Sequence, residues 1–208
     1  MSDAKKPGLW GKLKTALGGK TGEHKEEEKE ESLYSPQKSE PVDLLFVKKF
    51  TASGGKFLYC EKESDAYNFI SDITRESALQ RLYCDDPSLR SILSKAGFRD
   101  LAEHVEQADA FCSTCEYLVS FNGGIMITAR QTKGKKLTEL PETFITFART
   151  SQIVPNLRAA LTGIRTRYQP DIPSQITTIK GPIEGSEDEA DSKLCKKEIY
   201  LLLLEDQV

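Results

Sequence analysis

The sequence predicts an α/β fold in which a mostly parallel sheet carries helices on both faces. Short apolar runs alternate with segments of helical spacing from residue 41 to the end of the chain. The last run, residues 199–204, is continuously apolar, as is typical of a strand buried on both faces of a parallel sheet. Residues 1–40 are highly charged and nearly lack apolar residues. We therefore expect a charged tail of residues 1–40 and an α/β domain of residues 41–208.

The first half of the domain shows helix and strand signals in alternation. Apolar residues recur every three or four positions after Pro41, and Gly54-Gly55 ends that helix. Asp86-Pro87 is a typical helix start, with a capping carboxylate before a proline in the first turn. The expected elements are a helix from residue 41, a strand at Lys56–Cys60, a helix from Ser64, a strand at residues 79–84 and a helix from Pro87 to Gly97.

The second half is richer in strands. Asn122-Gly123-Gly124 is a turn signal between two apolar runs and predicts a hairpin. A long helix is expected to begin at Ser151, with Pro155 in its first turn and Tyr168 near its end. The expected strands are residues 115–120, 125–129, 144–148, 176–179 and 199–204, with Gly181-Pro182 ending the fourth of these.

The tail contains one apolar cluster. Leu9, Trp10, Leu13 and Leu17 would share one face of a helix, with lysines to either side. One interpretation is a short helix that docks on a protein or makes weak contact with a membrane surface. The other is a marginal helix in a flexible tail, because two glycines weaken so short a segment.

Composition excludes several classes of protein. The formal net charge is −3, so we expect no nucleic-acid partner, since such proteins carry a basic face. The apolar run at residues 199–204 is far shorter than the roughly 20 residues that span a bilayer. The first ten residues lack the apolar segment of a secretory signal, and five cysteines without such a signal favour free thiols in the cytoplasm.

Two motifs could carry chemistry. Cys112 and Cys115 have the spacing of a redox pair or of half a zinc site, but the remaining cysteines are scattered singly, which favours buried thiols. His104 stands between Glu103 and Glu106 and could act as a general base, although a solvent-exposed segment explains this polar stretch more simply. We expect no bound metal and no cofactor, and the sequence contains no P-loop and no dinucleotide-binding glycine motif.

Two glycine turns could let a backbone amide approach an anion. Asn122, Gly123 and Gly124 could do so, or they could simply close a hairpin. Gly181 and Pro182 follow a strand, and α/β sheets bind ligands at the carboxyl ends of their strands. The residues alone leave both alternatives open.

A set of ordered motifs resembles one family. These motifs are Cys115-Glu116-Tyr117-Leu118-Val119 with Gly123, then Gly134-Lys135-Lys136-Leu137, Pro141, Thr150-Ser151-Gln152-Ile153-Val154, and Gly181-Pro182 before the last apolar strand. Together they are similar to the LUD domain, a family of lactate-utilisation proteins. The resemblance implies a fold like those of sugar-phosphate isomerases and CoA transferases. It also implies work beside iron–sulfur subunits that oxidise L-lactate to pyruvate.

The resemblance also points to site residues. Glu116 matches a frequently acidic family position and Lys136 a frequently basic one, so the candidate ligand-binding residues are Glu116, Asn122, Gly123, Gly124, Lys136, Gly181 and Pro182. The segment after Gly181-Pro182 departs from the family, because acidic residues replace an Arg- and Thr-containing motif. An acidic loop there would repel carboxylates and phosphates.

Three hypotheses follow for function. The first is a diverged LUD-domain protein that is non-catalytic or nearly so and serves as an accessory component of an assembly linked to lactate utilisation. The second is an active subunit of an iron–sulfur L-lactate oxidation complex. The third is a scaffold docked to a membrane through the tail helix. Whether the chain is an enzyme, and which residues would be catalytic, stays open at this point.

Overall fold

A computed structural model describes residues 40–182 and 197–206. The expected tail helix of Leu9, Trp10, Leu13 and Leu17 lies outside the described residues, as does the acidic segment after Pro182. In the part of the chain that is described, no helix is both long enough and apolar enough to cross a membrane.

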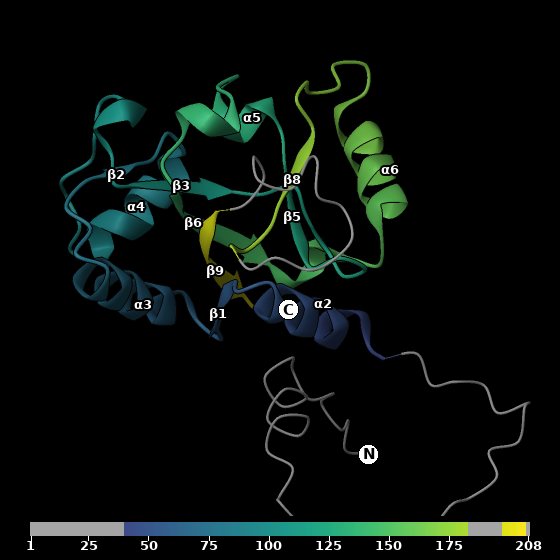
Figure 1. The fold of residues 1–208 in the computed structure, drawn as a ribbon, viewed down its shortest axis with the longest axis horizontal. Coiled ribbons are helices and arrows are strands. Elements are labelled where there is room, and N and C mark those ends of the chain that lie inside the picture. The colour runs from purple at the N-terminus through teal and green to yellow at the C-terminus, as the bar shows by residue number, and fades with distance from the viewer. Residues whose placement is uncertain (1–39, 183–196, 207–208) are drawn as a thin grey trace, which may run out of the picture.

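A five-stranded parallel sheet forms the centre of the domain (Figure 1). Its order is β1 (Lys56–Cys60), β9 (Glu198–Leu204), β6 (Thr143–Arg149), β3 (Ala110–Thr114) and β2 (Leu82–Tyr83). β9 pairs with β1 on one side and β6 on the other, and Ile199 to Leu203 are all buried. The prediction of a central, doubly buried last strand is therefore correct, as is the α/β fold class.

Two helices cover one face of this sheet. α3 (Glu63–Glu76) buries Ala66, Ile70 and Ile73, and α4 (Pro87–Lys95) buries Leu89 and Leu93. α4 begins where predicted, since the Asp86 side chain accepts hydrogen bonds from the first turn. Their apolar residues pack with alternate side chains of the parallel strands.

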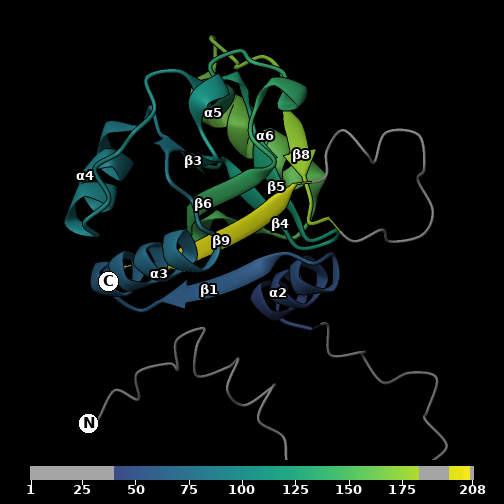
Figure 2. The same cartoon turned by 60° about the vertical axis from the view of Figure 1, so that its left-hand side comes forward.

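The other face is covered by α2 (Val42–Ala52) and by a second sheet. This sheet has the order β7 (Ile153–Val154), β4 (Tyr117–Val119), β5 (Gly124–Ile127) and β8 (Thr177–Ile179). The β4–β5 and β5–β8 pairs are antiparallel, and the β4–β7 pair is parallel. α6 (Leu157–Tyr168) packs on its outer face (Figures 1 and 2). The short helix α5 (Ala129–Thr132) follows β5.

The structure differs from the sequence-based expectation at three places. β3 was not expected from the sequence; it ends at Thr114, immediately before Cys115. The long helix begins at Leu157 instead of Ser151, because Asn156 caps it through a 3.0 Å bond to the amide of Ala159. The residues before it form a 3₁₀ turn, Thr150–Gln152, and the strand β7, so Pro155 lies outside the helix.

Candidate functional site

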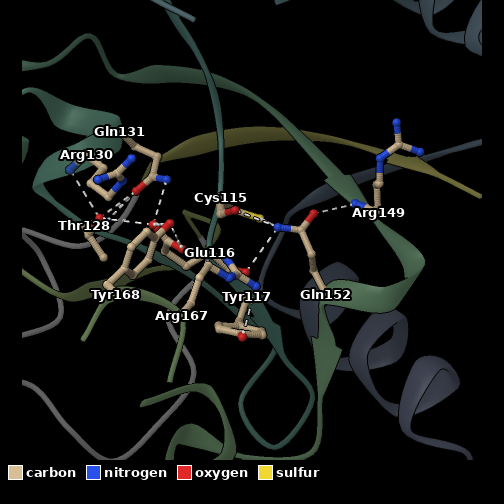
Figure 3. Close-up of polar contacts among 10 residues, drawn as sticks. All are labelled: Cys115, Glu116, Tyr117, Thr128, Arg130, Gln131, Arg149, Gln152, Arg167 and Tyr168. Atoms are coloured by element: carbon tan, nitrogen blue, oxygen red, sulfur yellow. Dashed lines mark hydrogen bonds and ion pairs between the residues drawn. The ribbon is translucent and has the colours of Figure 1, made fainter. Parts of the chain in front are cut away.

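Glu116 holds a buried carboxylate at the junction between the two sheets. It follows β3 and precedes β4, and only 1% of it is exposed. Its oxygens accept hydrogen bonds from Tyr168 Oη at 3.0 Å, Gln131 Nε2 at 3.0 Å and Arg167 Nη1 at 3.1 Å (Figure 3). Thr128 Oγ1 lies 3.3 Å from one of these oxygens. We call these five residues the Glu116 network.

The donors come from two helices that are distant in sequence. Thr128 caps α5, since its hydroxyl accepts from the amide of Arg130 while its own amide donates to Gln131 Oε1 at 2.9 Å. Arg167 and Tyr168 stand at the end of α6. Glu116 thus ties α5 and α6 to the β3–β4 junction.

Arg167 supplies the positive charge of the network. Its Nη1 forms an ion pair with Glu116, and its Nη2 donates to Tyr117 Oη at 3.1 Å. Its guanidinium also lies 5.1 Å from the centre of the Tyr117 ring. Burial by itself lowers the pKa of Arg167, but the hydrogen bond with Tyr168 and the nearby tyrosines and Glu116 raise it above its usual range. Arg167 therefore keeps its positive charge next to Glu116.

Gln152 fixes the backbone on which Glu116 is carried. Its Nε2 donates to the carbonyl oxygens of Cys115 at 2.6 Å and of Glu116 at 3.1 Å. Its Oε1 accepts from the amide of Arg149 at 2.7 Å (Figure 3). The turn after β6 thereby satisfies the polar backbone where the chain passes from one sheet to the other.

The predicted glycine turns lie at the other end of the β4–β5 hairpin. Val119 pairs with Gly124 near the turn, whereas Tyr117 pairs with Met126 beside Glu116. The turn is closed by Asn122 Oδ1, which accepts from the amide of Gly124 at 3.0 Å. Gly123 has φ +65°, and a Cβ there would lie 2.5 Å from the backbone of Lys49 in α2.

Gly181 lies at the same end as Gly123. A Cβ on Gly181 would lie 2.2 Å from the carbonyl oxygen of Ser53, just after α2. The structure thus places Gly123 and Gly181 against the end of α2, whereas Gly124 faces Thr178 of β8. Pro182 follows and is exposed, and all of these residues lie apart from Glu116. A ligand-binding role for these residues stays a prediction.

Lys136 is exposed and stands at a third place. Together with Leu137, Ile176 and Thr177 it lines a shallow depression of about 360 Å³. Within the described ranges, the Lys136 ammonium forms no ion pair with Glu116. The two charged candidates that the resemblance suggests are therefore not in contact.

The C-x-x-C spacing does not produce a pair of thiols. Cys112 packs on the α3 and α4 side of the parallel sheet, whereas Cys115 packs with the cluster on the opposite face. The four cysteines in the described ranges are free and buried. Burial raises the pKa of Cys115 well above its usual value, so this thiol is poorly suited to nucleophilic or redox work. His104 is exposed, and within residues 40–182 and 197–206 no group of three or more His, Cys, Asp or Glu side chains could hold a metal ion.

A cleft of about 470 Å³ adjoins the Glu116 network at the carboxyl ends of β2 and β3. Its lining includes Arg130, Gln131 and Tyr168 together with Asp85 and Asp86. Nothing in the sequence pattern predicts this cleft. The capping-box pattern from Thr128 to Gln131 could have predicted the start of α5, but it gives no sign of the long-range contact with Glu116.

Comparison with known proteins supports the resemblance. The family model of the LUD domain matches residues 79–204, which is more than half of the chain. The chain belongs to the LUD-domain family. A solved structure of a DUF162 family protein from Deinococcus radiodurans has a similar fold, with a TM-score of 0.55 and 14% sequence identity. The similarity covers 79% of this chain and 96% of the other. A search of curated proteins found no significant match.

Proposed function

We propose that this LUD-domain protein is a non-catalytic accessory component of a protein assembly linked to lactate utilisation. Its partners would be the iron–sulfur subunits that oxidise L-lactate to pyruvate. The proposal rests on the burial and the hydrogen bonds of Glu116, the acidic residue that the family resemblance suggests as a site residue.

The Glu116 carboxylate is already fully engaged within the protein. A general base must come within hydrogen-bond reach of a substrate proton. Glu116 is 1% exposed, and its two oxygens accept from Gln131, Arg167 and Tyr168. To act on a substrate it would have to break contacts with both α5 and α6. This arrangement favours a structural role for the carboxylate.

The glycine turns support the same conclusion. Their lack of side chains makes room for the protein's own backbone, since Gly123 faces Lys49 and Gly181 faces Ser53. An anion that approached these amides would meet the end of α2. The two ends of the β4–β5 hairpin are thus both occupied by internal contacts.

The alternative function is an active subunit of an iron–sulfur L-lactate oxidation complex. The observation that favours it is the 470 Å³ cleft, which shares Gln131 and Tyr168 with the Glu116 network. A substrate in this cleft would lie close to the network without entering it.

Reconstitution with the partner subunits tests this proposal. The full chain is mixed with iron–sulfur subunits of L-lactate oxidation, and L-lactate-dependent reduction of a dye is measured with and without it. We expect the chain to co-purify with these subunits and to show no turnover by itself. Turnover of L-lactate by the chain alone, or failure to associate with the subunits, would contradict the proposal.

A further inference from the structure

We propose that the cleft at the carboxyl ends of β2 and β3 binds a small molecule through a carboxylate or phosphate group. We call it the β2–β3 cleft, and the lining residues used below are Asp85, Asp86, Ser113, Arg130, Lys133 and Tyr168. The inference goes beyond the accessory role and does not depend on it, because a protein can bind a small molecule without transforming it.

The cleft lies where the chain leaves two neighbouring strands in opposite directions. After β2 it runs into α4 on one face of the parallel sheet, whereas after β3 it runs into β4 on the other face. In open α/β sheets such a point leaves a crevice at the strand carboxyl ends, and ligands bind there. The volume of about 470 Å³ falls within the range of small-molecule sites.

Both carboxylates of the cleft already have partners. Asp86 Oδ1 accepts from the amide of Ser88 at 2.9 Å and from the Ser88 hydroxyl at 2.6 Å. Asp85 pairs with Lys133 at 3.0 Å and lies 3.7 Å from Arg90. These internal contacts engage the Asp85 carboxylate, one oxygen of Asp86 and the Lys133 ammonium.

The polar groups left over are able to donate hydrogen bonds. Ser113 is 5% exposed, and its hydroxyl has no hydrogen-bond partner among the described residues. The Arg130 guanidinium stacks 4.7 Å from the centre of the Tyr168 ring and has no carboxylate partner within residues 40–182 and 197–206. A buried polar group without a partner is costly, so Ser113 favours an occupant that can accept a hydrogen bond.

These donors suit an anionic oxygen group. A guanidinium donates two parallel hydrogen bonds to a carboxylate or a phosphate, and stacking on a tyrosine leaves its edge available for them. Asp85 pairs with Lys133 and Asp86 accepts from Ser88, so neither carboxylate is paired with Arg130. The cleft therefore favours a small ligand with one such group and a polar remainder.

The test is calorimetric titration of the full chain with three probes of one carbon skeleton: glycerate, glycerol 3-phosphate and glycerol. We expect at least one of the two anions to bind and glycerol not to bind. Binding of glycerate alone would assign a carboxylate site, and binding of glycerol 3-phosphate alone would assign a phosphate site. If neither anion binds at concentrations up to about 10 mM, the proposal is overturned. A Kd above that value corresponds to a binding free energy weaker than roughly 3 kcal/mol.

Variants tie any binding to the cleft. Arg130→Gln should raise the Kd roughly tenfold or more, because the charge-assisted pair is lost. Ser113→Ala should weaken binding by a smaller factor. Arg158→Gln, at an exposed arginine of α6 outside the cleft, is the matched control and should bind like the unaltered protein. Arg130 is exposed, so its variant should keep the fold; equal Kd values for Arg130→Gln and the unaltered protein would refute the assignment.

Discussion

Replacing Glu116 with alanine should lower the free energy of unfolding by about 3 kcal/mol. Removing one member of a buried ion pair typically costs about 3–5 kcal/mol, because the other charge loses its partner. Here the side chain of Arg167 is 45% exposed, so water recovers part of that loss. Gln131 and Tyr168 would each lose an acceptor as well. These opposing effects place the expected loss near the lower end of the range.

The assay is chemical and thermal unfolding of the purified full chain. For a protein of this size, about 3 kcal/mol corresponds to a fall in Tm of roughly 6–12 °C. Glu103→Ala is the matched control, because Glu103 is exposed and has no ion pair among the described residues. It should change stability by less than about 0.5 kcal/mol. A loss below about 1 kcal/mol for Glu116→Ala would refute the structural role of this carboxylate.

Two further variants separate charge from hydrogen bonding. Glu116→Gln keeps an acceptor oxygen but leaves the Arg167 guanidinium without its counter-charge. Adding Arg167→Met removes that unpaired charge and preserves apolar contact with Tyr117. We therefore expect the double variant to be more stable than Glu116→Gln alone. If the second change lowers stability further, the ion pair is not the reason for the loss.

Four other predictions follow from the structure. Leu202→Ala in the central strand should cost about 2–5 kcal/mol in urea unfolding, and a loss below about 1 kcal/mol would contradict its burial. Gly181→Ala should lower the free energy of unfolding by about 1–3 kcal/mol, since the new Cβ meets the Ser53 carbonyl oxygen. Unchanged stability would contradict the close contact between Gly181 and the end of α2. Hydrogen bonds from the amides of Arg81 and Gln80 lower the pKa of Asp109, so its stabilising effect should be present at neutral pH and disappear as the pH falls through that lowered pKa. Unfolding of the unaltered protein and Asp109→Ala across pH 2–7 should therefore converge at the acid end; a constant difference would contradict this. The four cysteines of the described ranges are buried away from reagents, and burial raises the pKa of Cys60 to about 12. A Cys195→Ser variant should therefore show little reaction with a thiol reagent at pH 8 until denaturant is added, and rapid reaction of the folded variant would contradict the burial of these thiols.

Local signals predicted the elements whose ends are determined by nearby residues. β1 was predicted correctly because a glycine pair precedes it, and α4 because Asp86 caps it through its own first turn. β3 was missed because its five residues contain two polar side chains and no flanking glycine or proline. Its strand character comes from parallel pairing with β6, whose residues lie more than thirty positions away. Only the folded chain brings such partners together.

The start of α6 shows the same limit. Residues from Ser151 onward have helical spacing, but β7 pairs with β4 and holds this segment extended. The capping side chain of Asn156 then begins the helix after Pro155. Here a tertiary contact overrides local helix propensity.

The candidate site was predictable only in part. Glu116 could be singled out through a family resemblance, but its partners Arg167 and Tyr168 are 51 and 52 residues further along. No periodicity or spacing connects them. The glycine turns were recognised as turns, whereas their packing against α2 depends on how the hairpin folds over the sheet.

A structural role for Glu116 is tested most directly by the rate of L-lactate oxidation in an assembly reconstituted with the Glu116→Gln/Arg167→Met variant. If Glu116 is structural, the rate per folded chain should remain within about twofold of the unaltered protein once the network is neutralised. If Glu116 acts as a general base, the rate should fall by roughly 100-fold or more while Tm is preserved. A loss of that size in a folded, assembled variant would contradict the accessory role.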